Sequence, residues 1–389
     1  MESVILRINE QLAACPCGHA HRPVRMHGVL EHGAIGNVAP YIAQAGWRQV
    51  LIAADGHTWE AAGQALNDHL QAHGIRVDIC QFAENERGDV MADAASILHL
   101  MLHVSERTEA IIACGSGTIH DIVRFVTAKT GKPFLSVPTS ASVDGFTSAG
   151  APLIIAGVKR TIQTKAPEAI FADLDVLAVA PLSLTAAGLG DMLGKFTSLA
   201  DWQVSRDMAG EPFCPAAYEL TKEALERCVA AVDQIAAGGE QGIRQLMEAL
   251  LISGWSMLAI EHSRPASGGE HHLSHIWEMQ SIRQGLKQQL HGAKVGVATV
   301  LLSGLYKRLA GLTTAHEAFR VYESLPDSGE LAALLDKLGA PVTPGQLGIS
   351  AERVLEALRQ GPDLRERATG LRYIRDHHPE WFEEVAYGE

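Results

Sequence analysis

Carboxylate and imidazole side chains gather in three short segments of the second half of the chain. Asp191 stands among apolar residues in a predicted helix, and His271 and His275 open another helix four residues apart. This spacing places both rings on one helical face. His291 begins a further apolar helix. One carboxylate with imidazoles forms a mixed oxygen and nitrogen set that suits Zn, Fe or Ni and leaves positions open for substrate oxygens.

Each of these residues also has a simpler interpretation. Asp191 could form a surface ion pair with Lys195, one helical turn further on. The chain contains 18 histidines, so some close spacing is expected by coincidence. The concentration of candidates in these segments favours a metal site, but spacing alone leaves His275 in competition for a ligand position.

The first half of the chain alternates short apolar runs with helical patterns, which is typical of a parallel sheet covered by helices. The predicted strands are Gln49–Ala54, Glu109–Cys114 and Pro133–Val137. A helix over Ile119–Ala128 joins the last two of them.

From Pro181 the patterns become long and helical, with few strand signals. The helices predicted there are Ala187–Trp202, Ala216–Ala236, Gly242–Ile260 and Ala351–Arg359. We therefore predict an α/β domain with a parallel sheet over residues 1–180 and an all-α domain over residues 181–389.

The ends of the predicted strands carry groups that suit a nucleotide. The segment Gly115–Asp121 joins a strand to a helix, where small residues let backbone N–H groups and the positive helix end approach a pyrophosphate. His120 stands where the dinucleotide fingerprint has a glycine, so a tight structural turn is the alternative. The next strand ends in Pro138–Asp144, which supplies three hydroxyls and a carboxylate. Asp55 ends an earlier strand, and it could bind a ribose and favour NAD or form an ordinary turn.

Composition narrows the class of partner. The formal net charge of −13 argues against a nucleic-acid surface and favours a small diffusing substrate. The longest apolar run, Leu246–Ile260, is interrupted by polar residues, so we expect no membrane span. The opening residues lack the pattern of a secretory signal, which makes the cytoplasm the expected compartment.

A second cluster of soft ligands lies near the start of the chain. Cys15, Cys17, His19 and His21 place four candidate metal ligands within seven residues, a tighter spacing than in the usual zinc finger. A secondary metal or redox role and an irregular loop are both open interpretations. The other four cysteines are scattered and do not suggest a disulfide framework.

Five motifs in this order closely resemble one family. They are GSGTIHD at Gly115–Asp121, PTSASVDG at Pro138–Gly145, GLGD at Gly188–Asp191, SRPASGGEHHLSH at Ser263–His275 and HGAKVG at His291–Gly296. Together they resemble the bacterial type of sn-glycerol-1-phosphate dehydrogenase. That family belongs to the superfamily of iron-dependent alcohol dehydrogenases, glycerol dehydrogenases and dehydroquinate synthases. Ser116 stands where archaeal relatives often have a third glycine, which favours the bacterial branch.

The resemblance implies a dehydroquinate synthase-like fold, with a Rossmann-like N-terminal domain, a helical C-terminal metal-binding domain and the active site between them. It implies a metal site of Asp191, His271 and His291, holding nickel, zinc or iron, and it assigns His275 to the substrate instead. Asp144 and Asp191 would also contact the substrate. The residues implied to bind NAD(P) are Asp55, Gly117, Thr118, Ile119, His120, Asp121, Thr139, Ser140, Ala141, Ser142 and Ser148.

The implied reaction is hydride transfer between NAD(P)H and dihydroxyacetone phosphate, giving sn-glycerol 1-phosphate, in a cytoplasmic homodimer. A glycerol or polyol dehydrogenase would use the same ligands without the phosphate, and the cations Lys159, Arg160, Lys165 and Arg264 are candidates to discriminate. A dehydroquinate-synthase-like cyclase would use NAD only transiently. A catalytically silent nucleotide-binding homologue is the non-enzymatic alternative, and it is disfavoured because the whole ligand set is present.

Overall fold

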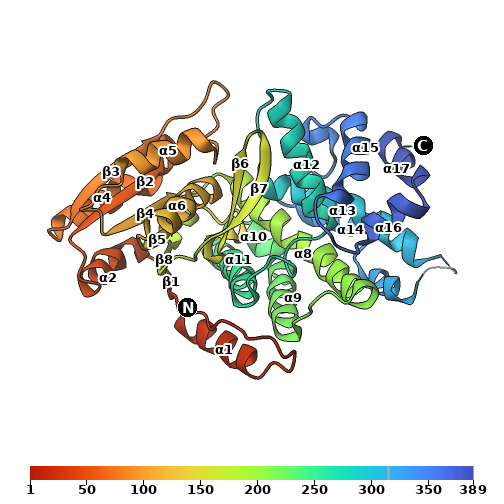
Figure 1. Ribbon diagram of the computed structural model, residues 1–389, viewed down its shortest axis with the longest axis horizontal. Coiled ribbons are helices and arrows are strands. Elements are labelled where there is room, and N and C mark those ends of the chain that lie inside the picture. Colours follow the sequence, from red (N-terminus) through yellow and green to blue (C-terminus); the bar gives the residue numbers. More distant parts are fainter. Residues whose placement is uncertain (313–315, 389) are drawn as a thin grey trace.

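A six-stranded parallel sheet forms the first half of the protein, on the left of Figure 1. We describe a computed structural model, which covers residues 1–312 and 316–388. The strands lie in the order β1-β8-β5-β4-β2-β3, and every pairing between them is parallel. Their bounds are β1 His27–Glu31, β2 Gln49–Asp55, β3 Arg76–Phe82, β4 Ala110–Gly115, β5 Phe134–Pro138 and β8 Ala169–Asp173.

Both faces of this sheet are covered, which explains why its central strands read as continuous apolar runs. Along β2, Val50 and Ile52 enter one buried cluster, whereas Leu51 and Ala53 enter another on the opposite face. The helices of this half are α2 Val38–Gln44, α3 Gly56–Thr58, α4 Gln64–Ala72, α5 Ala94–His103, α6 Gly117–Thr130 and α7 Leu174–Leu177. Residues of α2 and α4 pack on the first face, and residues of α5 and α6 pack on the second.

An antiparallel hairpin stands between the sheet and the helices in Figure 1. Its strands are β6 Gly150–Ile155 and β7 Val158–Gln163. The turn between them holds Ala156 at a φ of 51° next to Gly157 at 75°, a left-handed pair that closes the two-residue connection. The hairpin packs against α6 on one side, and β7 contacts helix α12 on the other.

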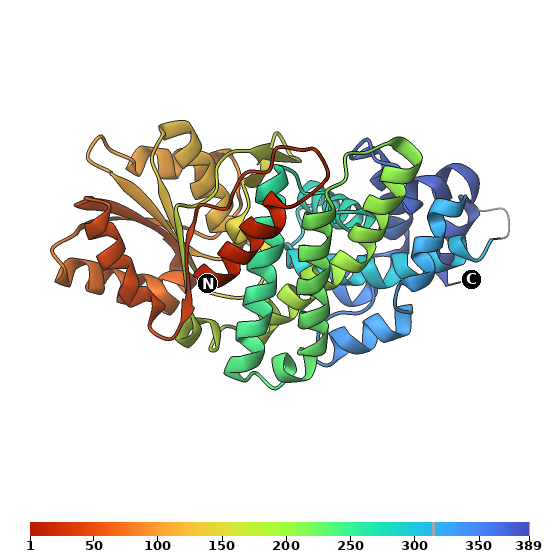
Figure 2. The same ribbon diagram turned by 90° about the horizontal axis from the view of Figure 1, so that it is seen from below.

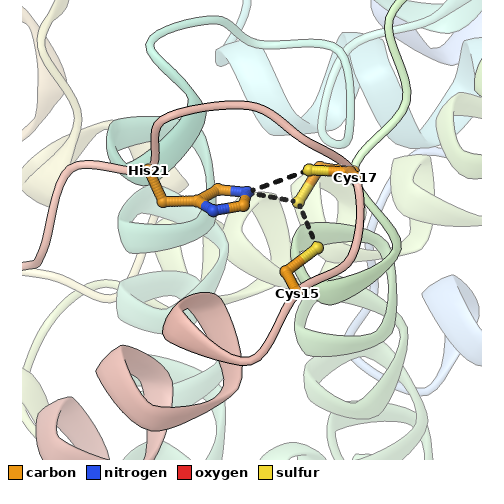
Figure 3. A group of neighbouring side chains, drawn as sticks. Cys15, Cys17 and His21 are labelled. Carbon is orange, nitrogen blue, oxygen red and sulfur yellow. Dashed lines mark hydrogen bonds between the residues drawn. The ribbon is translucent and has the colours of Figure 1, made fainter.

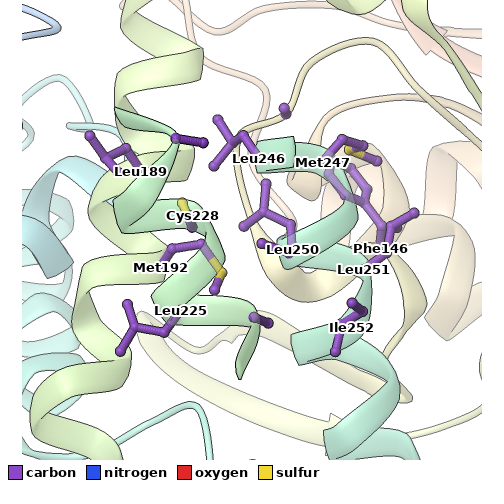
Figure 4. Close-up of a cluster of buried hydrophobic side chains, with 14 of the residues drawn as sticks. Phe146, Leu189, Met192, Leu225, Cys228, Leu246, Met247, Leu250, Leu251 and Ile252 are labelled. Atoms are coloured by element: carbon purple, nitrogen blue, oxygen red, sulfur yellow. The ribbon is translucent and has the colours of Figure 1, made fainter. Parts of the chain in front are cut away.

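The second half of the protein is helical. Its helices are α8 Leu182–Ala209, α9 Pro215–Ala230, α10 Val232–Ala236, α11 Glu240–Ile260, α12 Gly269–Arg283, α13 His291–Ala310, α14 Ser328–Asp336, α15 Ala351–Gln360, α16 Gly370–His377 and α17 Glu380–Tyr387. Figure 4 shows the largest core cluster, where Leu189 and Met192 of α8 face Leu246 and Leu250 of α11. The first helix, α1 Glu2–Ala13, lies beside α9 and α11 when the molecule is seen from below (Figure 2).

The three predicted strands and the helix after β4 are confirmed within two residues at each end. The single helix predicted over Ala216–Ala236 is wrong, because α9 ends at Ala230 and α10 begins at Val232. Ala231 takes a φ of −95° and ψ of 2°, and this break turns Val232 and Ile235 into the core.

Helix α11 contains the apolar run that came closest to a membrane segment. Among the described residues it is the one helix long and apolar enough to cross a bilayer, but 67% of its most apolar stretch is buried inside the protein. It packs against α8 and α9 and against the short 3-10 helix at Asp144–Thr147. Its composition is therefore that of a core helix.

Candidate active site

A cavity of about 440 Å³ opens between the carboxyl ends of the sheet strands and the helices of the second half. Asp55 is the last residue of β2, Ser116 follows β4, and both residues line the cavity. β2 and β4 are neighbours in the sheet, but the helices that follow them cover opposite faces: α4 after β2 covers one face, and α6 after β4 covers the other. A crevice at such a position is where open α/β sheets bind their ligands.

The turn between β4 and α6 presents its backbone to this cavity. Ser116 precedes the helix with a φ of −97°, and Gly117, Thr118 and Ile119 form the first turn of α6 on the cavity wall. A Cβ at Gly117 would lie 3.3 Å from the Val143 side chain, so glycine at this position lets the turn lie close to the segment that contains Val143. The positive end of α6 thus points into the space that a pyrophosphate would occupy.

The structure divides the residues expected to bind the dinucleotide into two groups. The residues that line the cavity are Asp55, Gly117, Thr118, Ile119, Asp121, Ser142 and Ser148. The residues that do not line it are His120, Thr139, Ser140 and Ala141. The ring of His120 is buried and hydrogen-bonded to the Ser136 hydroxyl at 2.7 Å and to the Ser116 carbonyl oxygen at 2.9 Å. Burial lowers its pKa to about 3.

Asp191, His271 and His291 meet on the helical side of the cavity. One ligand atom from each lies within 4.8 Å of the others, and all three residues are buried or half-buried. His271 Nε2 is 3.7 Å from Asp191 Oδ1, and the His271 and His291 rings are 5.1 Å apart. His275 lies outside this group, with its ring 6.0 Å from that of His291, but it lines the same cavity. The structure thus places His291, not His275, beside His271 and Asp191.

Glycines let the helices that carry these ligands come into backbone contact. A Cβ at Gly190 of α8 would lie 2.3 Å from the Gly292 carbonyl oxygen, and one at Gly292 of α13 would lie 1.8 Å from the Ala187 carbonyl oxygen. Asp191 and His291 directly follow and precede these glycines. The distance between the two ligands is therefore fixed by the main chain of α8 and α13, which is why small residues flank both.

Glu270 supports the His271 ring from behind. Its Oε1 accepts a hydrogen bond from His271 Nδ1 at 2.7 Å, so Nε2 is the atom that faces Asp191. Burial acts to raise the pKa of Glu270, but His271 and the other donors outweigh it and lower that pKa to about 2. A carboxylate that orients a metal-binding histidine in this way is a recurrent feature of metal sites. Glu270 was not predicted from the sequence, although its position beside His271 was the available signal.

Lys195 pairs with Asp191, but not on the surface. Its ammonium group is fully buried, 3.0 Å from Asp191 Oδ1 and 2.8 Å from Asp144 Oδ2. Burial acts to raise the pKa of Asp191, and Lys195, His291 and His271 outweigh it and bring the pKa to about 2. Burial and the neighbouring Asp191 raise the pKa of Asp144. Asp191 thus remains ionised, as a metal ligand must be.

Asp144 is tied to the same centre through its backbone. The Asp144 N–H donates to Asp191 Oδ2 at 2.9 Å, and the Ser253 hydroxyl donates to Asp144 Oδ2 at 2.8 Å. Burial lowers the pKa of His291 to about 3 and that of His275 well below its usual value. Both rings are therefore neutral near pH 7, and each offers a nitrogen lone pair.

Two cationic side chains near His275 also line the cavity. Lys159 of β7 and Arg365 both line the cavity, and both act on the pKa of His275 as neighbouring positive charges. Lys159 is paired with Glu278 at 2.8 Å. Arg365 donates only to hydroxyls, those of Ser263 at 2.9 Å and Ser267 at 3.4 Å, within the described part of the chain. Arg365 is thus a cation in the cavity that forms no ion pair with a carboxylate among residues 1–312 and 316–388.

Three of the four cations considered from sequence do not take this position. Arg264 is paired with Glu211 at 2.8 Å, and Lys165 bonds the Lys132 carbonyl oxygen. Neither of these, nor Arg160, is among the residues that line the cavity. Arg365 was missed because it lies 69 residues beyond the last recognised motif, His291–Gly296, and only the fold brings it to the site.

Comparison with known proteins agrees with this geometry. The glycerol-1-phosphate dehydrogenase (NAD(P)+) of Bacillus licheniformis is 45% identical over 97% of this chain and 96% of its own length. That of Bacillus subtilis is 47% identical over 90% of this chain and 91% of its own. This chain belongs to the glycerol-1-phosphate dehydrogenase family. The family model described as iron-containing alcohol dehydrogenase also matches residues 29–181.

Solved structures with the same fold extend beyond this family. The glycerol dehydrogenase of Schizosaccharomyces pombe superposes with a TM-score of 0.69 at 19% identity, covering 93% of this chain and 90% of that one. The NADH-dependent butanol dehydrogenase A of Thermotoga maritima gives a TM-score of 0.68 at 15% identity, covering 95% and 98%. The predicted fold class, a parallel-sheet half followed by a helical half as in the dehydroquinate synthase-like proteins, is confirmed.

Proposed function

We propose that this protein reduces dihydroxyacetone phosphate reversibly to sn-glycerol 1-phosphate by hydride transfer from NADH or NADPH. One observation carries the proposal: His271 and His291 line the same cavity as the turn at the start of α6, and a ligand atom of the buried Asp191 lies within 4.8 Å of theirs. A metal site and a dinucleotide turn that share one cavity can hold a ketone between them. Membership of the glycerol-1-phosphate dehydrogenase family supports the choice of substrate.

In this proposal Asp191, His271 and His291 hold one divalent metal ion. The donor set fits, since Asp191 is ionised, His291 is neutral and Glu270 turns His271 Nε2 toward Asp191. Nickel, zinc and iron all accept such a mixed oxygen and nitrogen set. When bound, the metal polarises the substrate carbonyl and stabilises the negative charge that develops on its oxygen.

The dinucleotide lies along the sheet edge in this proposal. The residues proposed to contact it are Asp55, Gly117, Thr118, Ile119, His120, Asp121, Thr139, Ser140, Ala141, Ser142 and Ser148. His120, Thr139, Ser140 and Ala141 lie behind the cavity wall, so their part is to shape the turn. The nicotinamide supplies the hydride, and the protein positions it against the ketone.

The substrate is held between the carboxylates and the cations. In this proposal Asp144 and Asp191 bind its hydroxyl groups. Arg365 and Lys159 bind its phosphate, and Arg365 is available for this because it forms no ion pair with a carboxylate among the described residues. Arginine suits phosphate because its planar donors bind two oxygens at once. This cation separates the proposal from a dehydrogenase that acts on free glycerol.

His275 is the protein group placed to exchange the proton of the substrate hydroxyl. Its pKa lies well below the usual value because it is buried among Lys159, His291 and Arg365, so its ring is neutral at pH 7. A neutral ring accepts the hydroxyl proton when the alcohol is oxidised and returns it when the ketone is reduced. The proton then passes to the cavity opening through water.

We propose in addition that the enzyme is a cytoplasmic homodimer and that its domains divide at residue 180, which lies between α7 and α8. The resemblance to the bacterial branch of the family supports the dimer. Light scattering on the purified chain tests it, and a monomeric mass would contradict it.

One experiment tests the function. The purified protein is assayed with NADH and NADPH against dihydroxyacetone phosphate and dihydroxyacetone, and its metal content is determined. We expect turnover with the phosphorylated ketone and loss of both turnover and tight metal binding in Asp191→Ala. Full activity in that variant would refute the metal role. Preference for dihydroxyacetone would instead show a polyol dehydrogenase, and absence of net NADH consumption would show a cyclase.

A further inference from the structure

The N-terminal cysteine motif forms a side-chain cluster with a residue from a distant part of the chain. Cys15, Cys17 and His21 lie on the loop after α1, and Figure 3 shows their side chains pointing toward one another. Cys214 joins them from the segment between α8 and α9. One ligand atom of each of the four lies within 4.8 Å of the others. Nearly two hundred residues separate Cys214 from the motif, so the fold itself assembles this group.

The distances in the cluster match those between the ligands of a tetrahedral metal. Cys15 Sγ lies 3.7 Å from Cys214 Sγ, and His21 Nε2 lies 3.3 Å from Cys17 Sγ and 3.1 Å from Cys214 Sγ. Zinc bonds of about 2.3 Å to sulfur and about 2.0 Å to nitrogen place tetrahedral ligands roughly 3.5–3.8 Å apart. Small side-chain shifts would therefore admit an ion at the centre.

The surroundings of the cluster are those of a structural site. Cys214 is only 2% exposed and caps the start of α9, where its sulfur accepts a hydrogen bond from the Ala217 N–H at 3.4 Å. The Ala217 N–H acts to lower the pKa of the Cys214 thiol, but burial outweighs it and raises that pKa to about 12, so the thiolate form needs a cation beside it. Cys15 and Cys17 pack against the small apolar cluster around Trp202 and Cys214. His19, the other histidine of the motif, is exposed and lies outside the group.

We propose that Cys15, Cys17, His21 and Cys214 bind a structural zinc ion, distinct from the metal at Asp191. Four protein ligands complete a tetrahedron and leave no position for a substrate, which is typical of structural and not catalytic zinc. Three sulfurs and one nitrogen select a softer ion than the oxygen and nitrogen set of Asp191, His271 and His291 does.

The zinc ion would cross-link the N-terminal segment to the helical half of the protein. Helix α1 is amphipathic and buries Ile5, Ile8 and Leu12, and the loop after it leads into β1, which pairs only with β8 at the edge of the sheet. Its other ties to the protein include the bond from the Arg22 N–H to the Ala259 carbonyl oxygen at 3.1 Å. A metal cross-link between residues 15–21 and 214 closes a long loop, and it stabilises the fold by restricting the unfolded chain.

Metal content in matched variants of the full chain tests the proposal. Asp191→Ala removes the other metal site, and in this background we expect about one zinc ion per chain by elemental analysis. Adding Cys17→Ser or His21→Ala should reduce the zinc to near zero and lower the melting temperature, whereas His19→Ala, in the same loop, should change neither. Equal zinc in all of these variants, or equal loss in His19→Ala, would overturn the assignment.

Cobalt provides a readout that does not depend on the variants being stable. Loaded with Co²⁺, the Asp191→Ala protein should show thiolate-to-cobalt charge-transfer absorption and intense tetrahedral d–d bands. The cluster supplies three sulfurs, whereas the group of Cys80, His99 and His103 supplies one, so Cys17→Ser should weaken the charge-transfer bands and Cys80→Ser should not. A spectrum without charge-transfer bands would overturn the proposal. So would a non-reduced protein that holds no zinc and whose mass shows a Cys15–Cys214 disulfide.

Discussion

Replacing Glu270 by glutamine tests whether the metal site depends on the group behind His271. Glu270 accepts hydrogen bonds from His271 Nδ1 at 2.7 Å, from the Gly268 N–H at 2.6 Å and from the Thr197 hydroxyl at 2.7 Å. Glutamine keeps an oxygen for the first two donors, and Thr197 can reverse its hydroxyl to accept from the new amide. The variant therefore keeps the shape of the site and removes one buried negative charge.

The expected loss follows from this lost charge. Substitution of an outer carboxylate typically weakens metal binding about 10- to 100-fold, which corresponds to roughly 1.4–2.7 kcal/mol. Competition with a fluorescent chelator measures the metal affinity, and urea unfolding of the metal-free protein measures stability separately. Glu248→Gln, on the outer face of α11 beside Arg227, is the matched control. Unchanged metal affinity in Glu270→Gln would refute the reasoning, and a loss of stability alone would make Glu270 only a structural residue.

Three further predictions concern the substrate, the fold and pH. Arg365→Ala should raise KM for dihydroxyacetone phosphate at least about tenfold while hardly changing turnover of dihydroxyacetone, whereas the exposed Arg160→Ala should change neither; steady-state kinetics on both ketones decide this. Gly188→Ala should destabilise the protein by about 1–3 kcal/mol in urea unfolding, because its Cβ would lie 1.9 Å from the Ala141 carbonyl oxygen, whereas Gly329→Ala, with open space around it, should stabilise slightly. Because burial depresses the pKa of His120 to about 3, the unfolded chain takes up a proton below about pH 6.5 that the folded protein does not. Lowering the pH should thus reduce the free energy of unfolding more steeply in the wild type than in His120→Gln, by about 1.4 kcal/mol per pH unit. Equal slopes between pH 6 and pH 4 would contradict this.

The sequence could predict those parts of the fold whose signals are local. Strand β4 is a run of buried apolar residues followed by a glycine turn, and this order of residues is enough to place it. The edge strand β3 was not predicted individually, because only Cys80 and Phe82 of its residues are buried and its sequence lacks the continuous apolar run of the central strands. The break at Ala231 could not be predicted either, since alanine favours a helix and only packing of Val232 and Ile235 interrupts it.

The same distinction applies to the candidate site. Spacing places His271 and His275 on one helical face, but it carries no information about where α13 crosses, and that crossing brings in His291. Lys195 was considered as a surface partner of Asp191, whereas the packing of α8 and α13 buries the pair completely. Cys214 and Arg365 have no sequence neighbours that suggest a function. Their roles depend on contacts between segments far apart in the chain.

Arg124 gives the cavity a property that neither half has alone. Its buried guanidinium group is bonded to Asp121 at 2.8 Å on the dinucleotide side and to the carbonyl oxygens of Gly145 and Gly150 beside Asp144. We therefore expect a dinucleotide that contacts Asp121 to affect the turn at Asp144 and Gly145 through this side chain. Linkage requires the effect to be reciprocal, so each ligand should alter the affinity of the other by the same factor. Calorimetric titrations in both orders would reveal this cooperativity, and it should disappear in Arg124→Met.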